Sequence, residues 1–193
     1  VCSSDLNMSR AIRIVMTVIL ACICQTDLVK YIRIAGVAPD MMTVFLVLLT
    51  GYTGAYGGFC AGSVMALLYD ASVGYVLAIN LVCYTFIGWA APMLRHAMNK
   101  QLHRVKHKSY FELIVICFFL VLVREGVYIG YLFLIGAEQS IVTILRALLC
   151  SAYSAVMILP CSLIQNKIMS VHIIRKKKNE DLVGDSEGAG RKR

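Results

Sequence analysis

Charged side chains are scarce in this chain. Only 16% of its 193 residues are Asp, Glu, Lys or Arg, whereas 59% are hydrophobic. A soluble domain typically carries about 25% charged and about 45–50% apolar residues. Because no polar stretch is long enough to form a soluble catalytic domain, we expect an integral membrane protein with one membrane domain and short loops.

The sequence also lacks the motifs of common catalytic sites. It contains no GxSxG, no HExxH and no P-loop, and no two carboxylates have a spacing suited to acid–base work. We therefore expect neither an enzyme nor a cofactor. His103 and His107 are four residues apart and could share a metal ion on a helix, but basic residues surround them. We expect them to lie on a solvated or headgroup-contacting face, and we predict no metal site.

Cysteine is not lacking, but its positions argue against redox or metal chemistry. No CxxC pair occurs among the eight cysteines, and seven of them lie inside apolar stretches. A buried free cysteine behaves as a small hydrophobic side chain. We therefore expect these thiols to contribute to packing.

Long apolar stretches dominate the chain. A membrane-crossing helix needs about 20 mostly apolar residues. Six candidate stretches follow one another: about 11–29, 40–53, 54–69, 74–94, 109–136 and 140–164. The sequence thus predicts an all-α integral membrane protein with a bundle of six transmembrane helices over residues 8–166.

Three boundaries in this scheme rest on features other than the length of an apolar stretch. The stretch 40–69 is too long for one straight crossing, and glycines at its middle allow a turn, so we predict two helices there. These glycines are Gly51, Gly54, Gly57 and Gly58. Residues 1–7, which resemble translated adapter DNA, are predicted to be non-native. Residues 167–193 are basic and without apolar periodicity, so we predict a disordered tail.

The positive charges indicate how the helices are oriented. Most of the 19 Lys and Arg residues fall in three clusters: Arg10 and Arg13; Arg95, Lys100, Arg104, Lys106 and Lys108; and Lys167, Arg175, Lys176, Lys177, Lys178, Arg191, Lys192 and Arg193. The positive-inside rule assigns all three clusters to the cytoplasm. Both termini are then cytoplasmic, and Asp40, Asp70 and Glu138 lie near the outer face. The basic tail is suited to anionic lipid, and we expect no nucleic-acid partner.

A stripe of small residues marks the third stretch. Its members recur at a spacing of four: Gly54, Gly58, Gly62, Ala66, Asp70 and Gly74. Four residues advance a helix by slightly more than one turn, so these positions form one face with little side-chain bulk. Such a face lets another helix approach closely in a membrane. Packing alone accounts for the glycines, whereas Asp70 adds a charge and so a candidate partner interface.

Two adjacent charges stand near the middle of the fifth stretch. Arg124 and Glu125 lie inside an apolar segment, where a charge costs about 2.5–3.5 kcal/mol on insertion scales and usually faces the protein interior. Sequence neighbours lie about 100° apart on a helix, so we do not expect these two simply to neutralise each other. Arg146 in the sixth stretch is a candidate partner for Glu125. A structural ion pair and a role in partner or ligand binding both remain open.

Two segments within residues 11–95 combine these features, VAPDMMTVFLVLL and GAYGGFCAGSVMALLYDASVG. With them, residues 11–95 resemble the bacterial rod-shape-determining protein family MreD. The family's Pro-Asp, which opens the second span, matches Pro39 and Asp40. Its G…G…GF..G…D stretch matches Gly54, Gly58, Phe59, Gly62 and Asp70, and its next turn matches Gly74.

This resemblance implies a fold similar to the substrate-binding S-components of ECF transporters. It also implies a non-enzymatic role in the bacterial cytoplasmic membrane. The partners would be an MreC-like membrane protein and, indirectly, MreB and the peptidoglycan synthases. The matched positions would then serve helix packing or the partner interface.

An S-component-like subunit that carries a vitamin-sized molecule is the alternative function. It would need an enclosed pocket with converging polar groups. Because the apolar stretches supply few such groups, the sequence favours the scaffold.

Overall fold

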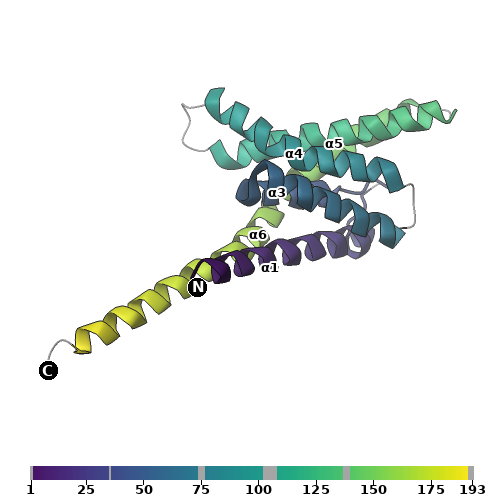
Figure 1. The fold of residues 1–193 in the computed structure, drawn as a ribbon. Helices are drawn as coiled ribbons and strands as arrows, with labels where there is room; N and C mark the ends of the chain where they lie inside the picture. The colour runs from purple at the N-terminus through teal and green to yellow at the C-terminus, as the bar shows by residue number, and fades with distance from the viewer. Residues whose placement is uncertain (1, 35, 74–76, 102–107, 137–139, 191–193) are drawn as a thin grey trace.

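The computed structural model describes residues 2–34, 36–73, 77–101, 108–136 and 140–190, with side chains for 11–34, 36–72, 79–98, 110–136 and 140–168. Within these ranges the protein is all-helical (Figure 1). The first helix, α1 (Cys2–Ile23), continues through a short π-helical turn, η1 (Cys24–Leu28), into α2 (Val29–Tyr31). Four further helices follow: α3 (Met41–Val73), α4 (Leu77–Gln101), α5 (Lys108–Leu134) and α6 (Ile141–Gly190).

The start of α3 is fixed by side chains that bind its free backbone N–H groups. Asp40 is the N-cap, since its Oδ1 accepts a hydrogen bond from the N–H of Thr43 at 3.2 Å. Gln25, which lies in η1, accepts a second bond from the N–H of Met41 at 2.8 Å. The π-helical turn thus places an amide where the first turn of α3 needs an acceptor.

The backbone of α3 breaks at Gly54, which has a φ of 73° and a ψ of −169°. Glycine adopts this left-handed φ without the steric cost of a Cβ. Tyr84 of α4 contacts both Asp40, at the start of α3, and Gly62, in its second half. The two halves of α3, 41–53 and 55–73, therefore run in opposite directions. The break falls at the predicted boundary between the second and third stretches, but the halves form one bent element. The described residues hold five long helices, not the predicted six.

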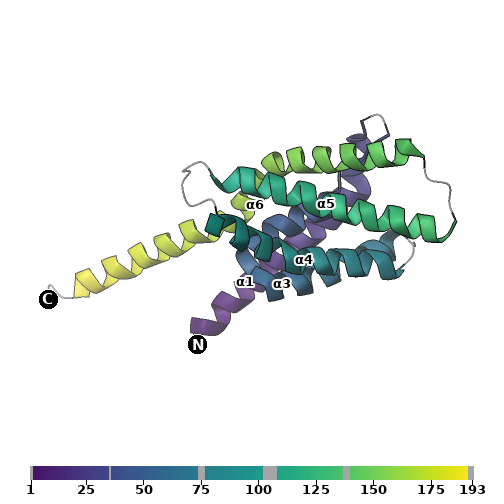
Figure 2. The same cartoon turned by 90° about the horizontal axis from the view of Figure 1, so that it is seen from above.

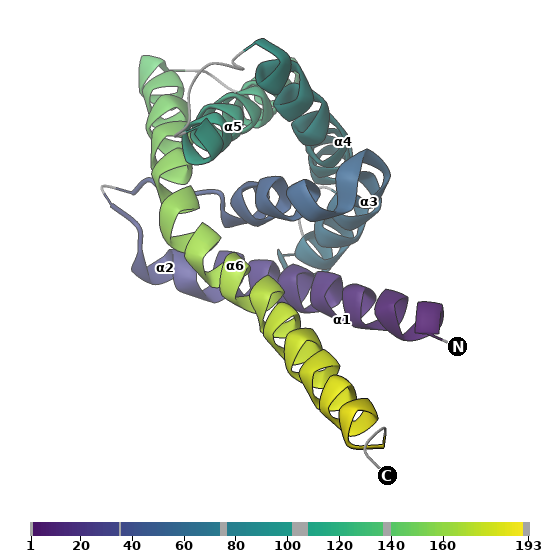
Figure 3. The ribbon, with the colours of Figure 1, turned by 90° about the vertical axis from the view of Figure 1, so that its left-hand side faces the viewer.

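The first half of α3 forms the centre of the molecule. Every residue from 40 to 50 is buried, and end-on the first half of α3 lies between α1 on one side and α4 and α5 on the other (Figure 3). Met41, Phe45 and Leu49 are among its fully buried side chains. The core of the bundle is thus built around this short helical segment.

The second half of α3 packs closely against α4. A Cβ atom built on Gly58 would overlap the carbonyl oxygen of Gly88, and one on Gly62 would overlap that of Tyr84. Gly88, which the sequence argument missed, faces Gly58 in return. Gly54 belongs to the spacing but not to this contact, because the space around it is open. Its contribution is the bend, and Gly74 lies outside the described residues.

Helix length and composition are those of a multi-pass membrane protein. Four segments among the described residues are long and apolar enough to cross a membrane: Ala11–Tyr31, Met41–Ser72, Tyr110–Leu134 and Ile141–Ile168. α4, which covers most of the predicted fourth stretch, is not one of the four, and its described part includes Asn80, Pro92 and Arg95. Large apolar side chains such as Leu134 and Ile141 are highly exposed, as lipid-facing side chains are.

The ends of the chain differ from the sequence-based expectation in one respect. α6 continues to Gly190, so residues 167–190, which we expected to be disordered, extend the last helix. The Lys, Arg and Glu residues in this segment are good helix formers. Figures 1 and 2 show α1 beginning at the end of the bundle from which the tail of α6 projects.

Candidate functional site

Asp40 lies at the point where four helices meet. Its side chain is 1% exposed, and its Oδ2 lies 3.1 Å from Nη1 of Arg124 in α5. The hydroxyl of Tyr84 in α4 donates to Oδ1 at 3.2 Å. The backbone N–H of Asp40 donates to Oγ of Ser154 in α6 at 2.8 Å. One carboxylate and its backbone thus join the core helix α3 to α4, α5 and α6.

Arg124 is shared between two carboxylates. Besides Asp40, its Nη1 lies 3.1 Å from Oε1 of Glu125, and its guanidinium carbon lies 5.1 Å from the centre of the Tyr84 ring. Arg124 and Glu125 thus form an ion pair although they are neighbours in sequence, but they do not simply neutralise each other, because Arg124 also binds Asp40. The arginine side chain is long enough to reach from its own helix position to the neighbouring one. The ion pair then stabilises both charged side chains where little water is available to solvate them.

A polar cavity of about 610 Å³ adjoins this cluster. It is lined by residues of the α1–α2 segment, of the link to α3, and of α3, α5 and α6. Its charged and polar lining includes Gln25, Arg33, Asp40, Tyr69, Arg124, Glu125, Tyr128, Thr143 and Arg146. Pockets for small molecules measure about 300–1,000 Å³, so both the size and the lining suit a small polar ligand.

Arg146 lines this cavity, but it forms no ion pair with Glu125, its candidate partner. Its Nη2 donates to the carbonyl oxygen of Gly36 at 3.1 Å, and no ion pair joins it to an acidic group among the described side chains. The bond instead ties α6 to the link between α2 and α3. Glu125 already has Arg124 beside it, which leaves Arg146 available to the backbone.

Asp70 lies inside the molecule and not on a surface open to a partner. It is 2% exposed, and its Oδ1 accepts a hydrogen bond from Nδ2 of Asn80 in α4 at 2.7 Å. Its Oδ2 has no partner among the described atoms. The residue therefore links the far ends of α3 and α4, which fits the helix-packing role expected for it, while a role in a partner interface stays a prediction.

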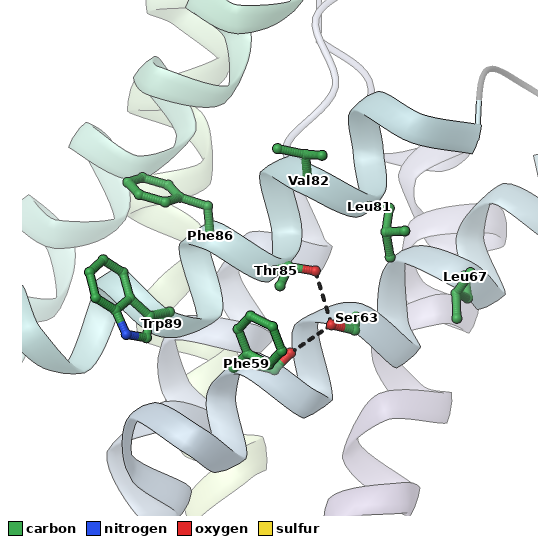
Figure 4. Close-up of a pocket in the computed structure, with 8 residues that line it drawn as sticks. All are labelled: Phe59, Ser63, Leu67, Leu81, Val82, Thr85, Phe86 and Trp89. Atoms are coloured by element: carbon green, nitrogen blue, oxygen red, sulfur yellow. Dashed lines mark hydrogen bonds between the residues drawn. The ribbon is translucent and has the colours of Figure 1, made fainter.

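An apolar groove runs along the outer face of the α3–α4 pair (Figure 4). It measures about 680 Å³ and is lined by Phe59, Ser63, Leu67, Leu81, Val82, Thr85, Phe86 and Trp89. The hydroxyls of Ser63 and Thr85 are 3.0 Å apart and form a hydrogen bond with each other. They therefore offer a ligand in the groove little hydrogen-bonding capacity. This groove suits an apolar chain and not a polar ligand.

No metal centre forms in the part of the chain that the structure describes, where no three His, Cys, Asp or Glu side chains lie together. His103 and His107 fall outside the described residues. The cysteines with described side chains are free thiols. The candidate site is therefore the charge cluster with its cavity.

Several residues of this site were not predicted from the sequence. Gln25, Tyr84 and Ser154 each bond to the start of α3 or to its N-cap, yet none belongs to a recognisable motif. The available signal was polarity, since each is a hydrogen-bonding side chain within an apolar helix. In lipid such groups need a partner inside the protein.

Comparisons with protein-family models, with curated proteins and with solved structures found no match.

Proposed function

We propose that this chain is a non-enzymatic membrane subunit of the bacterial cell-elongation machinery, similar to MreD. It would bind an MreC-like membrane protein and, through it, help to organise MreB and the peptidoglycan synthases. One observation carries the proposal: Asp40, whose Pro-Asp motif contributes to the resemblance, contacts three other helices through its carboxylate and backbone. The Pro-Asp motif thus lies where α3 contacts α4, α5 and α6.

The proposal includes six membrane crossings with both termini in the cytoplasm. We count the two halves of α3 as separate crossings because they run in opposite directions. The first half, at 13 residues, is shorter than the about 20 residues that a lipid-exposed crossing needs, but the other helices surround it. The basic clusters then lie on one side, as the positive-inside rule requires.

Affinity purification of the tagged full chain from bacterial membranes tests the partner directly. We expect an MreC-like single-span protein to co-purify. Asp40→Asn removes the charge opposite Arg124 and should reduce both the folded yield and the recovered partner. Asp27→Asn is the matched control, because Asp27 is 67% exposed and pairs only with Lys30 among the described residues. Recovery of the chain without any MreC-like protein would contradict the proposal.

A second function, an S-component-like carrier of a small molecule, is favoured by the polar cavity of about 610 Å³. From the sequence we expect few polar groups in the apolar stretches, whereas this cavity has nine charged or polar lining residues. A carrier should retain a stoichiometric small molecule through purification and lose it in Arg146→Gln. Mass spectrometry of denatured, purified protein would detect that molecule, and finding it without an MreC-like partner would replace the scaffold by the carrier.

A further inference from the structure

A second polar cavity lies toward the other end of the bundle. It measures about 220 Å³ and forms where the first half of α3 ends, among Tyr52, Arg95 of α4, Tyr110 of α5, and Gln165 and Asn166 of α6. Tyr110 and Arg124, which mark the two cavities on α5, are separated by roughly 21 Å at about 1.5 Å per residue. The two cavities are therefore distinct sites.

Gln165 points to an occupant of this cavity. Its side chain lines the cavity and is 1% exposed, yet neither its Nε2 nor its Oε1 has a hydrogen-bond partner among the described atoms. Buried amides are almost always hydrogen-bonded, because water that is lost on burial must be replaced. The cavity thus offers one unused donor and one unused acceptor.

Arg95 supplies a positive charge to the same cavity. Its guanidinium lies against Gly51, where a Cβ atom would overlap Nη1. No acidic residue lines the cavity, and Arg95 forms no ion pair with the described acidic side chains. This contrasts with Arg124, which two carboxylates neutralise. A planar guanidinium binds the oxygens of phosphate through paired hydrogen bonds.

We propose that this cavity binds a phosphate group, with Arg95 and Nε2 of Gln165 as donors. A hydroxyl of an attached headgroup, or the proton of a phosphate monoanion, would satisfy Oε1 of Gln165. The volume holds about seven water-sized groups at roughly 30 Å³ each, which accommodates a phosphate with a few attached atoms but not a nucleotide.

The phosphate has two possible sources, an anionic lipid headgroup or free phosphate. The cavity is accessible to either, because Tyr52, Tyr110 and Asn166 are exposed at its edge. The same end of the bundle is rich in positive residues, with Lys108 at the start of α5 and Lys167 beside the cavity residues of α6. Positive charge at a membrane surface attracts anionic lipid and phosphate alike.

The test measures both sources with the full chain. Native mass spectrometry of protein from phosphatidylcholine nanodiscs containing phosphatidylglycerol counts the retained anionic lipids. Calorimetric titration with inorganic phosphate in neutral detergent measures free phosphate. We expect Arg95→Gln to weaken whichever ligand binds by about tenfold or more. Gln165→Leu should also weaken it while keeping the fold, since it replaces an unpartnered buried amide by an apolar side chain of similar size.

Lys30→Gln is the control, because it removes one positive charge from an exposed site outside this cavity. The basic tail is identical in all these variants, so lipid held by the tail does not contribute to their difference. Loss of phosphatidylglycerol alone would assign the site to a headgroup, and loss of phosphate binding would assign it to the free ion. If the wild-type chain binds neither, or if Arg95→Gln and Gln165→Leu bind as tightly as wild type, the cavity holds water and the proposal is wrong.

Discussion

At the scale of single residues, Asp40 combines two roles that sequence reasoning treats separately. It caps the first turn of α3 and also forms the buried ion pair with Arg124. A buried ion pair adds little net stability, because both charges lose water, but removing one partner leaves the other uncompensated. The pair therefore specifies which helices meet. Removing one partner strongly lowers the stability of the fold, even though forming the pair adds little to it.

A double-mutant cycle tests this role. Asp40→Asn or Arg124→Gln alone should lower stability by about 3–5 kcal/mol, because each leaves a buried charge. The double variant should lose less than the sum of the two. Thermal unfolding in detergent measures the series. Glu125→Gln is a milder comparison, since Glu125 is 23% exposed. Strictly additive losses would contradict a direct coupling between Asp40 and Arg124.

At the scale of helices, α3 shows how glycines at one spacing serve different purposes. Gly54 provides a left-handed φ and reverses the chain, whereas Gly58 and Gly62 provide the space for α4. In lipid, where burying apolar surface gives little gain, such close backbone contact is a main source of helix association. The bend and the contact together hold the core helix and α4 in register.

Glycine-to-alanine substitutions distinguish a glycine that makes room for a neighbouring helix from one that only lies within a helix. Gly62→Ala should destabilise the protein by about 1–3 kcal/mol, because its Cβ would push against the backbone of α4. Gly130→Ala in α5 is the control: nothing lies within 4 Å of its Cβ position, so the better helix former should be neutral or stabilising. Melting temperatures in the same detergent report both, and equal effects would remove the packing argument.

At the scale of the whole molecule, apolar stretches predicted the helices well but not their contacts. Glycine spacing placed the break near residue 54 because chain reversal needs a residue without a Cβ. The candidate pair of Glu125 and Arg146 does not form, and Asp70 bonds to Asn80 within the bundle, since side-chain partners depend on how the helices turn toward one another. For the same reason no local pattern predicted that Tyr84, Ser154 and Gln25 gather at the start of α3.

The reversal at Gly54 makes a topological prediction. Tyr56, which is 91% exposed, lies just after the bend. With both termini in the cytoplasm, as proposed, a cysteine placed there should be labelled from the cytoplasmic side. A cysteine at Ser72, near the other end of that half, should be labelled from outside. Membrane-impermeant thiol reagents on intact cells and on inverted vesicles distinguish the two. Labelling of both positions from one side would contradict separate crossings by the two halves of α3.

The proposed role in cell shape is tested by depleting the protein in a rod-shaped bacterial host. We expect cells to become round as the protein is depleted, and we expect the wild-type gene to restore the rod shape whereas Asp40→Asn restores it poorly. Phase-contrast microscopy of the ratio of cell length to width is the measurement. Cells that remain rods after full depletion, with uptake of a small molecule lost instead, would contradict the scaffold and support the carrier.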